Sequence, residues 1–267
     1  MLTRRFAPIS LVALLVCLVV ARDAAAAPFQ AGDFVSHLQD EWGDASTVAG
    51  TRLTDYFNSV YGAVGYAEAG ISGAGGFSLL ITSAGSAFTY LPASGAPGAL
   101  IADLVDPGST PAGIFAGEVL ALRLNVDFSD AGYTLGSLGI PFGDLVFHDY
   151  SQVPQVNGLT VRQVLAEANT LLGGGAAGYS ITDANSILVN LNASFFQGPS
   201  EFAQNYLQVA GDTTSQPVPE PATLSLLGLA AVGWATRRRS SPRQQAPKAH
   251  RRPQVDRTIP GSAKTPG

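Results

Sequence analysis

Three residues between Asp33 and Glu41 have side chains that can bind a metal ion. Asp33, His37 and Glu41 are spaced four residues apart, so a helix would place them on one face. Imidazole and carboxylate groups at that spacing bind zinc or another divalent ion. A single histidine among acids is a poor zinc site, however, and the same spacing is typical of a solvated acidic helix. We therefore predict no metal and no other cofactor here, and keep these three residues as weak candidates.

Two short strings of Asp and Asn have parts of the spacing of a calcium loop. Asn125, Asp127 and Asp130 lack the alternation D-x-D-x-D-G, and a string that begins at Asp183 has leucine where the loop needs its glycine. Helix-start chemistry explains both strings better, because short polar side chains cap helices and acids favour the positive end of the helix dipole.

This chain contains no complete sequence motif for nucleophilic catalysis. The string GISGA at residues 70–74 lacks the last glycine of G-x-S-x-G, and neither His37 nor His148 has a serine partner by motif. The glycines from Gly173 follow a predicted helix and do not precede one. They therefore indicate the C-terminal end of a helix rather than a phosphate-binding loop. We predict that the protein is not an enzyme. The alternative of a secreted hydrolase or a carbohydrate-binding module stays open, because distant residues can form a pocket that a linear sequence hides.

The elements that would position these residues are mostly helical. Apolar spacing predicts seven helices and two strands. The helices are expected at 33–42, 51–60, 83–91, 99–105, 113–128 and 159–172, with a further one at 182–195, and the strands at 77–82 and 144–147. Thr160 is expected to cap the helix that ends at Gly173. The predicted fold is an α+β class, a predominantly helical single domain with a small β-sheet.

Charge divides the chain into three parts. Between residues 28 and 218 there are three basic residues against seventeen acidic ones, a formal charge of −14. Three further basic residues precede this segment, and nine follow it from Arg237 onward. An acidic body of this kind is repelled by nucleic acid and by anionic lipid headgroups. We expect no nucleic-acid partner.

The first 26 residues are typical of a secretory signal peptide. Arg4 and Arg5 precede an apolar run, and an alanine cluster with the A-x-A spacing of Ala24 and Ala26 follows it. We predict cleavage by signal peptidase after Ala26; the alternative is a retained membrane anchor. Cys17 lies inside the removed peptide, so the mature chain has no cysteine and no disulfide.

A second apolar run lies near the other end, from Thr223 to Thr236. As a helix its 14 residues would span about 21 Å, against about 30 Å of hydrocarbon. Three arginines follow it, which favours a cytoplasmic C-terminal flank and an acidic body outside. We predict a short transmembrane helix that holds the protein at the inner membrane for a limited time.

Three consecutive features together resemble the PEP-CTERM sorting signal of Gram-negative bacteria: Pro219, Glu220 and Pro221, then this apolar run, then the cluster Arg237, Arg238 and Arg239. The resemblance implies recognition and cleavage by an exosortase. Prolines would keep the motif extended and accessible to a protease. The tail from Ser240 to Gly267 departs from such signals, which usually stop after the arginines, and its composition is typical of disorder.

The segment between the two ends carries a second resemblance. The strings DEWGD, GFSLLITSAGSAFTYLP, AGIFAGEVLALRLNVDFSDAG and GLTVRQVLAEANTLLGGG occur in this order, followed by YSITDANSILVNLNASF. They are similar to an extracellular domain that recurs in secreted bacterial surface proteins, over most of residues 36–197. That domain has no established activity, so the resemblance implies no catalytic residues.

These observations predict an exported surface or extracellular-matrix protein with a non-catalytic ectodomain. Its expected parts are a signal peptide (1–26), an extracellular domain (28–210), a linker with the PEP motif (211–221), a sorting helix (223–236) and a basic tail (237–267). Its expected partners are signal peptidase and exosortase, with extracellular polysaccharide or matrix as a possible ligand. After processing, we expect it at the cell surface or in the medium.

Overall fold

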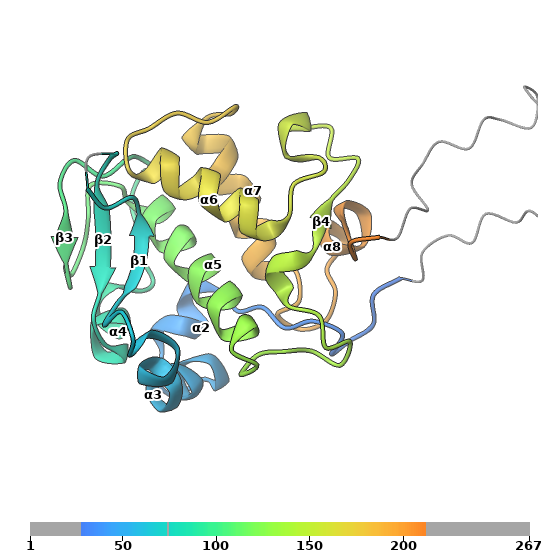
Figure 1. Ribbon diagram of the computed structural model, residues 1–267, viewed down its shortest axis with the longest axis horizontal. Coiled ribbons are helices and arrows are strands. Elements are labelled where there is room, and N and C mark those ends of the chain that lie inside the picture. Colours follow the sequence, from blue (N-terminus) through green and yellow to red (C-terminus); the bar gives the residue numbers. More distant parts are fainter. Residues whose placement is uncertain (1–27, 74, 212–267) are drawn as a thin grey trace, which may run out of the picture. The chain divides into compact units, whose positions relative to one another are not determined.

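Helix α5 (Ile114–Asp130) runs through the middle of a computed structural model that describes residues 28–73 and 75–211 (Figure 1). These residues form a mostly helical body with two small sheets. Thirteen of the seventeen residues of α5 are buried, which confirms the predicted buried helix. It packs against helices α6 (Val161–Leu172) and α7 (Ile181–Ala193) and against strand β1 (Ala67–Gly70).

Helices α6 and α7 both begin with a capping box. The Thr160 hydroxyl accepts a hydrogen bond from the Gln163 backbone N–H at 3.2 Å, and the Gln163 side chain accepts one from the Thr160 N–H at 2.8 Å. Ser180 and Asp183 repeat this exchange at the start of α7. Each box satisfies two N–H groups that the first turn of a helix leaves without partners. The predicted Thr160 cap is confirmed.

The first sheet has the order β1-β2-β3. Strand β2 (Ser78–Ile81) pairs antiparallel with β1, with Ala67 opposite Ile81. It pairs in parallel with β3 (Leu104–Val105), so the helix predicted at 99–105 is wrong. Tertiary hydrogen bonds hold this segment extended: the Leu100 N–H donates to the Leu172 carbonyl and the Asp103 carboxylate accepts from the Ser78 N–H.

Two helices precede this sheet in the chain, α2 (Gln39–Gly43) and α3 (Val48–Tyr61), and a third, α4 (Ala84–Tyr90), lies between β2 and β3. The predictions for α3 and α4 are confirmed, and Thr47 and Ser83 cap them. The helix predicted at 33–42 is wrong, because only its last part, α2, is helical. In the extended part the backbone N–H and C=O of His37 bond to the side chain of Asn125 in α5, instead of to helical neighbours.

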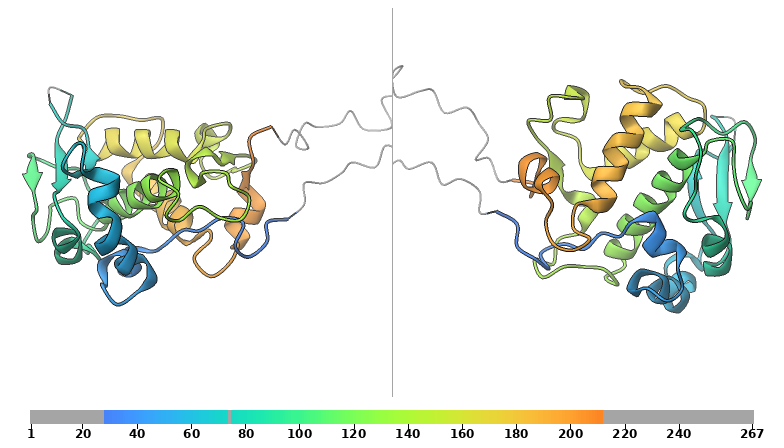
Figure 2. Two further views of the ribbon diagram at one scale, coloured as in Figure 1. Left: turned by 60° about the horizontal axis from the view of Figure 1, so that its bottom comes forward. Right: turned by 180° about the vertical axis from the view of Figure 1, so that it is seen from behind.

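The second sheet joins β4 (Val146–Phe147) to β5 (Leu207–Gln208), and two 3₁₀ turns, η1 (Phe142–Asp144) and η2 (Pro154–Val156), lie near β4 in the chain. The strand predicted at 144–147 is thus shorter than expected. Helix α8 (Glu201–Tyr206) leads into β5. Its Gln204 amide accepts from the N–H of Phe29 and donates to the Phe29 carbonyl. Both ends of the described chain therefore lie on the side of α8 and β4 (Figure 2).

Within residues 28–73 and 75–211, no helix has both the length and the apolar composition that a membrane span requires. The predicted signal peptide, with Ala24 and Ala26, lies outside the described residues. So do the sorting motif, the helix predicted at 223–236 and the basic tail.

Candidate functional site

The three weak metal candidates do not form one site. Asp33 caps a turn, accepting from the Gln30 N–H at 2.7 Å and from the Ser137 hydroxyl at 3.1 Å. His37 is buried, whereas Glu41 is partly exposed in α2. The common helical face that would have aligned them is absent, because residues 33–38 are not helical. Among the described residues, no group of three or more His, Cys, Asp or Glu side chains is arranged to hold a metal ion.

His37 is instead a core residue. It is 6 % exposed, and its ring meets the indole of Trp42 edge-on, with 5.2 Å between centroids. Neither ring nitrogen has a hydrogen-bond partner in the described part of the chain. Burial, followed by the positive charge of Arg52, lowers the pKa of His37 to about 4. The imidazole is therefore neutral at the pH of most extracellular fluids.

A buried polar network surrounds His37 and joins α2, α5 and α7. The Asn125 amide oxygen accepts from the His37 N–H and from the Trp42 indole N–H, and its amide nitrogen donates to Asn192. The Asn192 amide then donates to the carboxylate of Glu118 at 2.7 Å. Each bond satisfies a polar group that would otherwise be costly to bury.

Glu118 is the one carboxylate of this network. It accepts hydrogen bonds from the side chains of Gln39 and Asn192, and burial raises its pKa in spite of these two bonds. Gly117, directly before it, touches the Gln39 side chain so closely that a Cβ atom there would clash. Every polar atom of Glu118 is thus committed to holding helices together, which indicates a structural role.

The two calcium-like strings have separate explanations. Asp183 belongs to the capping box of α7, as helix-start chemistry predicted. That interpretation is wrong for Asn125, Asp127 and Asp130, because they lie in the C-terminal half of α5. Asn125 faces the buried network, whereas Asp127 and Asp130 pair with arginines. The spacing that resembled a calcium loop thus arises because Asn125 lies on the buried face of α5, whereas Asp127 and Asp130 lie on the face that carries the ion pairs.

His148 lies at the end of β4, as the sequence predicted. Its Nδ1 is 3.3 Å from a carboxylate oxygen of Asp149, and its backbone N–H bonds to the Tyr206 carbonyl. No hydrogen bond joins it to a serine, threonine or tyrosine hydroxyl among the described residues.

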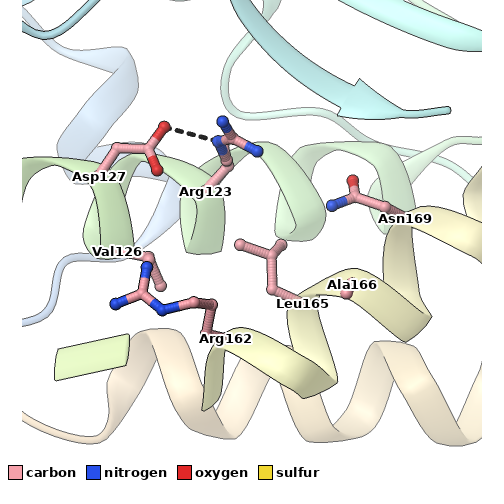
Figure 3. A pocket seen from close by; sticks show the side chains of 7 residues that line it. All are labelled: Arg123, Val126, Asp127, Arg162, Leu165, Ala166 and Asn169. Atoms are coloured by element: carbon pink, nitrogen blue, oxygen red, sulfur yellow. Dashed lines mark hydrogen bonds and ion pairs between the residues drawn. The ribbon is translucent and has the colours of Figure 1, made fainter. Parts of the chain in front are cut away.

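A hollow of about 230 Å³ lies between α5 and α6. Its floor consists of Val126, Leu165 and Ala166. Figure 3 shows the guanidinium groups of Arg123, from α5, and Arg162, from α6, beside it. The remaining lining residues are Asp127 and Asn169. An apolar floor with a few polar groups around it is the usual composition of a small-molecule site.

Arg123 and Asp127 form an ion pair on the exposed stripe of α5. The Arg123 Nε lies 2.5 Å from Asp127 Oδ2, and the two side chains are 36 % and 18 % exposed. Burial raises the pKa of Asp127, although the charge of Arg123 opposes the rise. Burial alone would lower the pKa of Arg123, but Asp127 reverses the direction and raises it. The guanidinium and the carboxylate thus each favour the charged form of the other, against the cost of burial.

Arg162 connects three segments of the chain. Its guanidinium donates two hydrogen bonds to Asp130, at the end of α5, and one to Asp144 in η1. The bond to Asp130, assisted by the bond to Asp144, raises the pKa of Arg162. A forked guanidinium that meets a carboxylate with two parallel bonds has a fixed orientation. The position of this arginine at the hollow is thus well defined.

A second hollow, of about 440 Å³, lies on the other side of the Arg123–Asp127 pair. It is lined by those two residues and by Ser59, Val60, Tyr61, Val64, Asp130 and Ala131. The Tyr61 hydroxyl is buried beside the ion pair, and burial, followed by the charge of Asp127, raises its pKa well above the usual value. We call the two hollows together the Arg123 groove.

Sequence reasoning named Asp127 and Asp130 but missed the groove that they line. Arg123, Val126, Asp127 and Asp130 are spaced as one helical face, and so are Arg162, Leu165, Ala166 and Asn169. A polar stripe on an otherwise apolar helix was the available signal. This signal is stronger because Arg123 and Arg162 are two of only three arginines between residues 28 and 218.

Comparison with known proteins identifies one segment of the chain. Residues 217–239 match the family model of the PEP-CTERM protein-sorting motif, which confirms that resemblance and marks the chain as an exosortase substrate. The matched range includes Glu220 and the cluster that ends at Arg239. No curated protein and no solved structure matches the chain. The similarity of residues 36–197 to a recurrent extracellular domain therefore stays a prediction.

Proposed function

We propose that this exosortase-processed, exported protein works at the cell surface or in the extracellular matrix, with an ectodomain that binds and does not catalyse. The sorting motif at residues 217–239 carries the proposal, since it places the protein in an export route. Signal peptidase is the expected partner at the N-terminus. The inner membrane is the expected site of processing, and the surface or the medium is the destination.

The charge of the body supports this destination. Its excess of acidic over basic residues keeps it soluble and repels it from anionic lipid headgroups and nucleic acid. An ectodomain with this surface would leave the membrane readily once its C-terminal segment is cut. Polysaccharide or another matrix component is the expected partner outside the cell.

The distribution of polar groups supports binding rather than catalysis. The hollow between α5 and α6 has no serine, threonine or cysteine nucleophile among its lining residues. Its carboxylate, Asp127, is engaged by Arg123. A hydrolase would need an activated nucleophile or a pair of carboxyl groups free to exchange protons. The hollow between α5 and α6 therefore favours the second candidate, a carbohydrate-binding module, over a hydrolase.

Cell fractionation of a host with an exosortase tests the proposal. We expect the wild-type protein in the surface or medium fraction, and the variant Glu220→Ala retained in the inner membrane. The matched control is Glu201→Ala, which removes an exposed glutamate from α8, outside the motif. If Glu220→Ala and the control distribute alike, with both outside the cell, the motif does not direct sorting.

A further inference from the structure

We infer that the Arg123 groove binds a neutral, hydroxyl-rich ligand, a hexose unit of a glycan. The inference rests on the proposed function, because it names the ligand class of the proposed ectodomain. The two hollows that form the groove meet at the Arg123–Asp127 ion pair, which both of them share. The hollow between α5 and α6, at about 230 Å³, has room for a single pyranose ring.

The apolar floor fits the carbon face of a sugar ring. Val126 and Leu165 are buried, and the small side chain of Ala166 leaves the space between the two helices open. A pyranose has one face of C–H groups and a perimeter of hydroxyls. Such a ligand would cover the floor and direct its hydroxyls toward the groups at the rim.

The rim has hydrogen-bonding capacity that the protein itself does not use. Arg123 donates one hydrogen bond to Asp127, through Nε, of the five that a guanidinium group can donate. The Asn169 oxygen accepts from the Gly70 N–H, and its amide nitrogen has no described acceptor. Hydroxyl groups both accept and donate, so a sugar can meet amide, guanidinium and carboxylate groups together.

Tyr61 adds a hydroxyl group to the second hollow. The residue is 3 % exposed, it lines the hollow, and its hydroxyl interacts with the Arg123–Asp127 pair. The groove therefore has polar groups on both sides of the ion pair.

The charge balance selects a neutral ligand. Asp127 neutralises Arg123, while Asp130 and Asp144 neutralise Arg162. An anionic ligand would meet arginines whose charge is already compensated, within a strongly acidic body. A cationic ligand would meet the terminal nitrogens of Arg123. A neutral polyol avoids both costs and still uses every free donor.

Ligand-observed saturation-transfer NMR on the full chain tests the inference. The chain is purified in a zwitterionic detergent, since a glycosidic detergent would itself occupy a sugar site. The probes are D-glucose, D-galactose and D-mannose, with D-glucuronate and D-glucosamine as charged forms of the same ring. We expect at least one neutral hexose to bind with a roughly millimolar dissociation constant, the usual range for so small a ligand. Both charged forms should bind more weakly.

Two variants assign the binding to the groove. Ala166→Leu fills the hollow from an exposed helical position, and Arg123→Gln removes the guanidinium donors. Each should weaken hexose binding at least tenfold. The matched controls are Ala176→Leu, at an exposed alanine outside the groove, and Arg52→Gln, at the third arginine of the body. Circular dichroism confirms that each variant is folded.

Three results would overturn the inference: no binding of any neutral hexose, stronger binding of a charged ring, or hexose binding that Ala166→Leu leaves unchanged. These outcomes are separate from the proposed function, which processing at the sorting motif tests. A correctly sorted protein that binds no sugar would refute only the ligand. A sugar-binding protein that is never processed would refute only the export proposal.

Discussion

Acid should destabilise this protein through one buried side chain, His37. Both ring nitrogens lack partners, so protonation would place a charge in the core with no hydrogen bond to stabilise it. The folded-state pKa is lowered to about 4, against 6.5 for the exposed imidazole. Below pH 6.5 the unfolded chain therefore binds a proton that the folded chain does not. Stability from this source is complete above pH 6.5 and is lost as the pH falls toward 4.

The size of the effect follows from the two pKa values. Between pH 7.5 and pH 5, His37 alone should lower the free energy of unfolding by about 2 kcal/mol. Glu118 and Asp127 act in the opposite direction, because burial raises the pKa of each carboxyl and the folded protein then holds its proton more tightly. The wild-type curve by itself therefore mixes opposing contributions, and variants at His37 are needed to separate them.

Urea unfolding of His37→Phe and His37→Gln, followed by circular dichroism at pH 7.5 and pH 5, isolates the histidine. Neither replacement titrates, although they differ in how well they pack against Trp42. Relative to each variant, the wild type should lose about 2 kcal/mol on acidification. Agreement between the two variants would exclude a packing effect. Parallel pH dependence of all three proteins would refute the reasoning and imply that His37 is solvated or hydrogen-bonded.

Other perturbations follow from the same structure. Asn125→Leu should cost about 3 kcal/mol or more in urea unfolding, because it leaves the Trp42 indole N–H and the His37 backbone without partners. Thr160→Ala should cost about 1 kcal/mol through loss of a capping box, and the exposed Thr182→Ala in α7 should cost less. Arg162→Met should cost less than about 1 kcal/mol, since its ion pairs are partly exposed, and adding salt should narrow the difference from wild type.

Local signals were sufficient for the elements that have strong apolar spacing. The helix after Thr160 has both a clear stripe and a capping box, and the buried run from residue 114 is long enough to exclude a short strand. The strand at Ser78–Ile81 was also predicted from its apolar side chains. In these places local propensity and tertiary packing favour the same structure.

Elsewhere, long-range hydrogen bonds decided the structure. His37 lies in an extended segment because its backbone bonds to Asn125, 88 residues away. The segment that ends at Val105 forms a strand because β2 offers it an edge. Strand β1, with the sequence AEAG, has little strand propensity, and its pairing with β2 and packing on α5 hold it in place. None of these partners can be read from a local window of sequence.

The candidate site depended on the same kind of information. The sorting motif is a contiguous string, so its residues could be named directly from the sequence. The groove unites Arg123 with Arg162 and Tyr61, which lie on three different helices. The spacing of the residues along the chain could predict each helical face, but it could not predict which faces lie beside one another in the fold.

Intact mass of the protein recovered from cells and from medium is the most direct test of export and sorting. We expect the mature species to lack residues 1–26 and the segment from Thr223 to Gly267, and the variant Glu220→Ala to retain that segment in the membrane fraction. Recovery of a wild-type species outside the cell that still contains Thr223 to Gly267 would contradict processing by an exosortase.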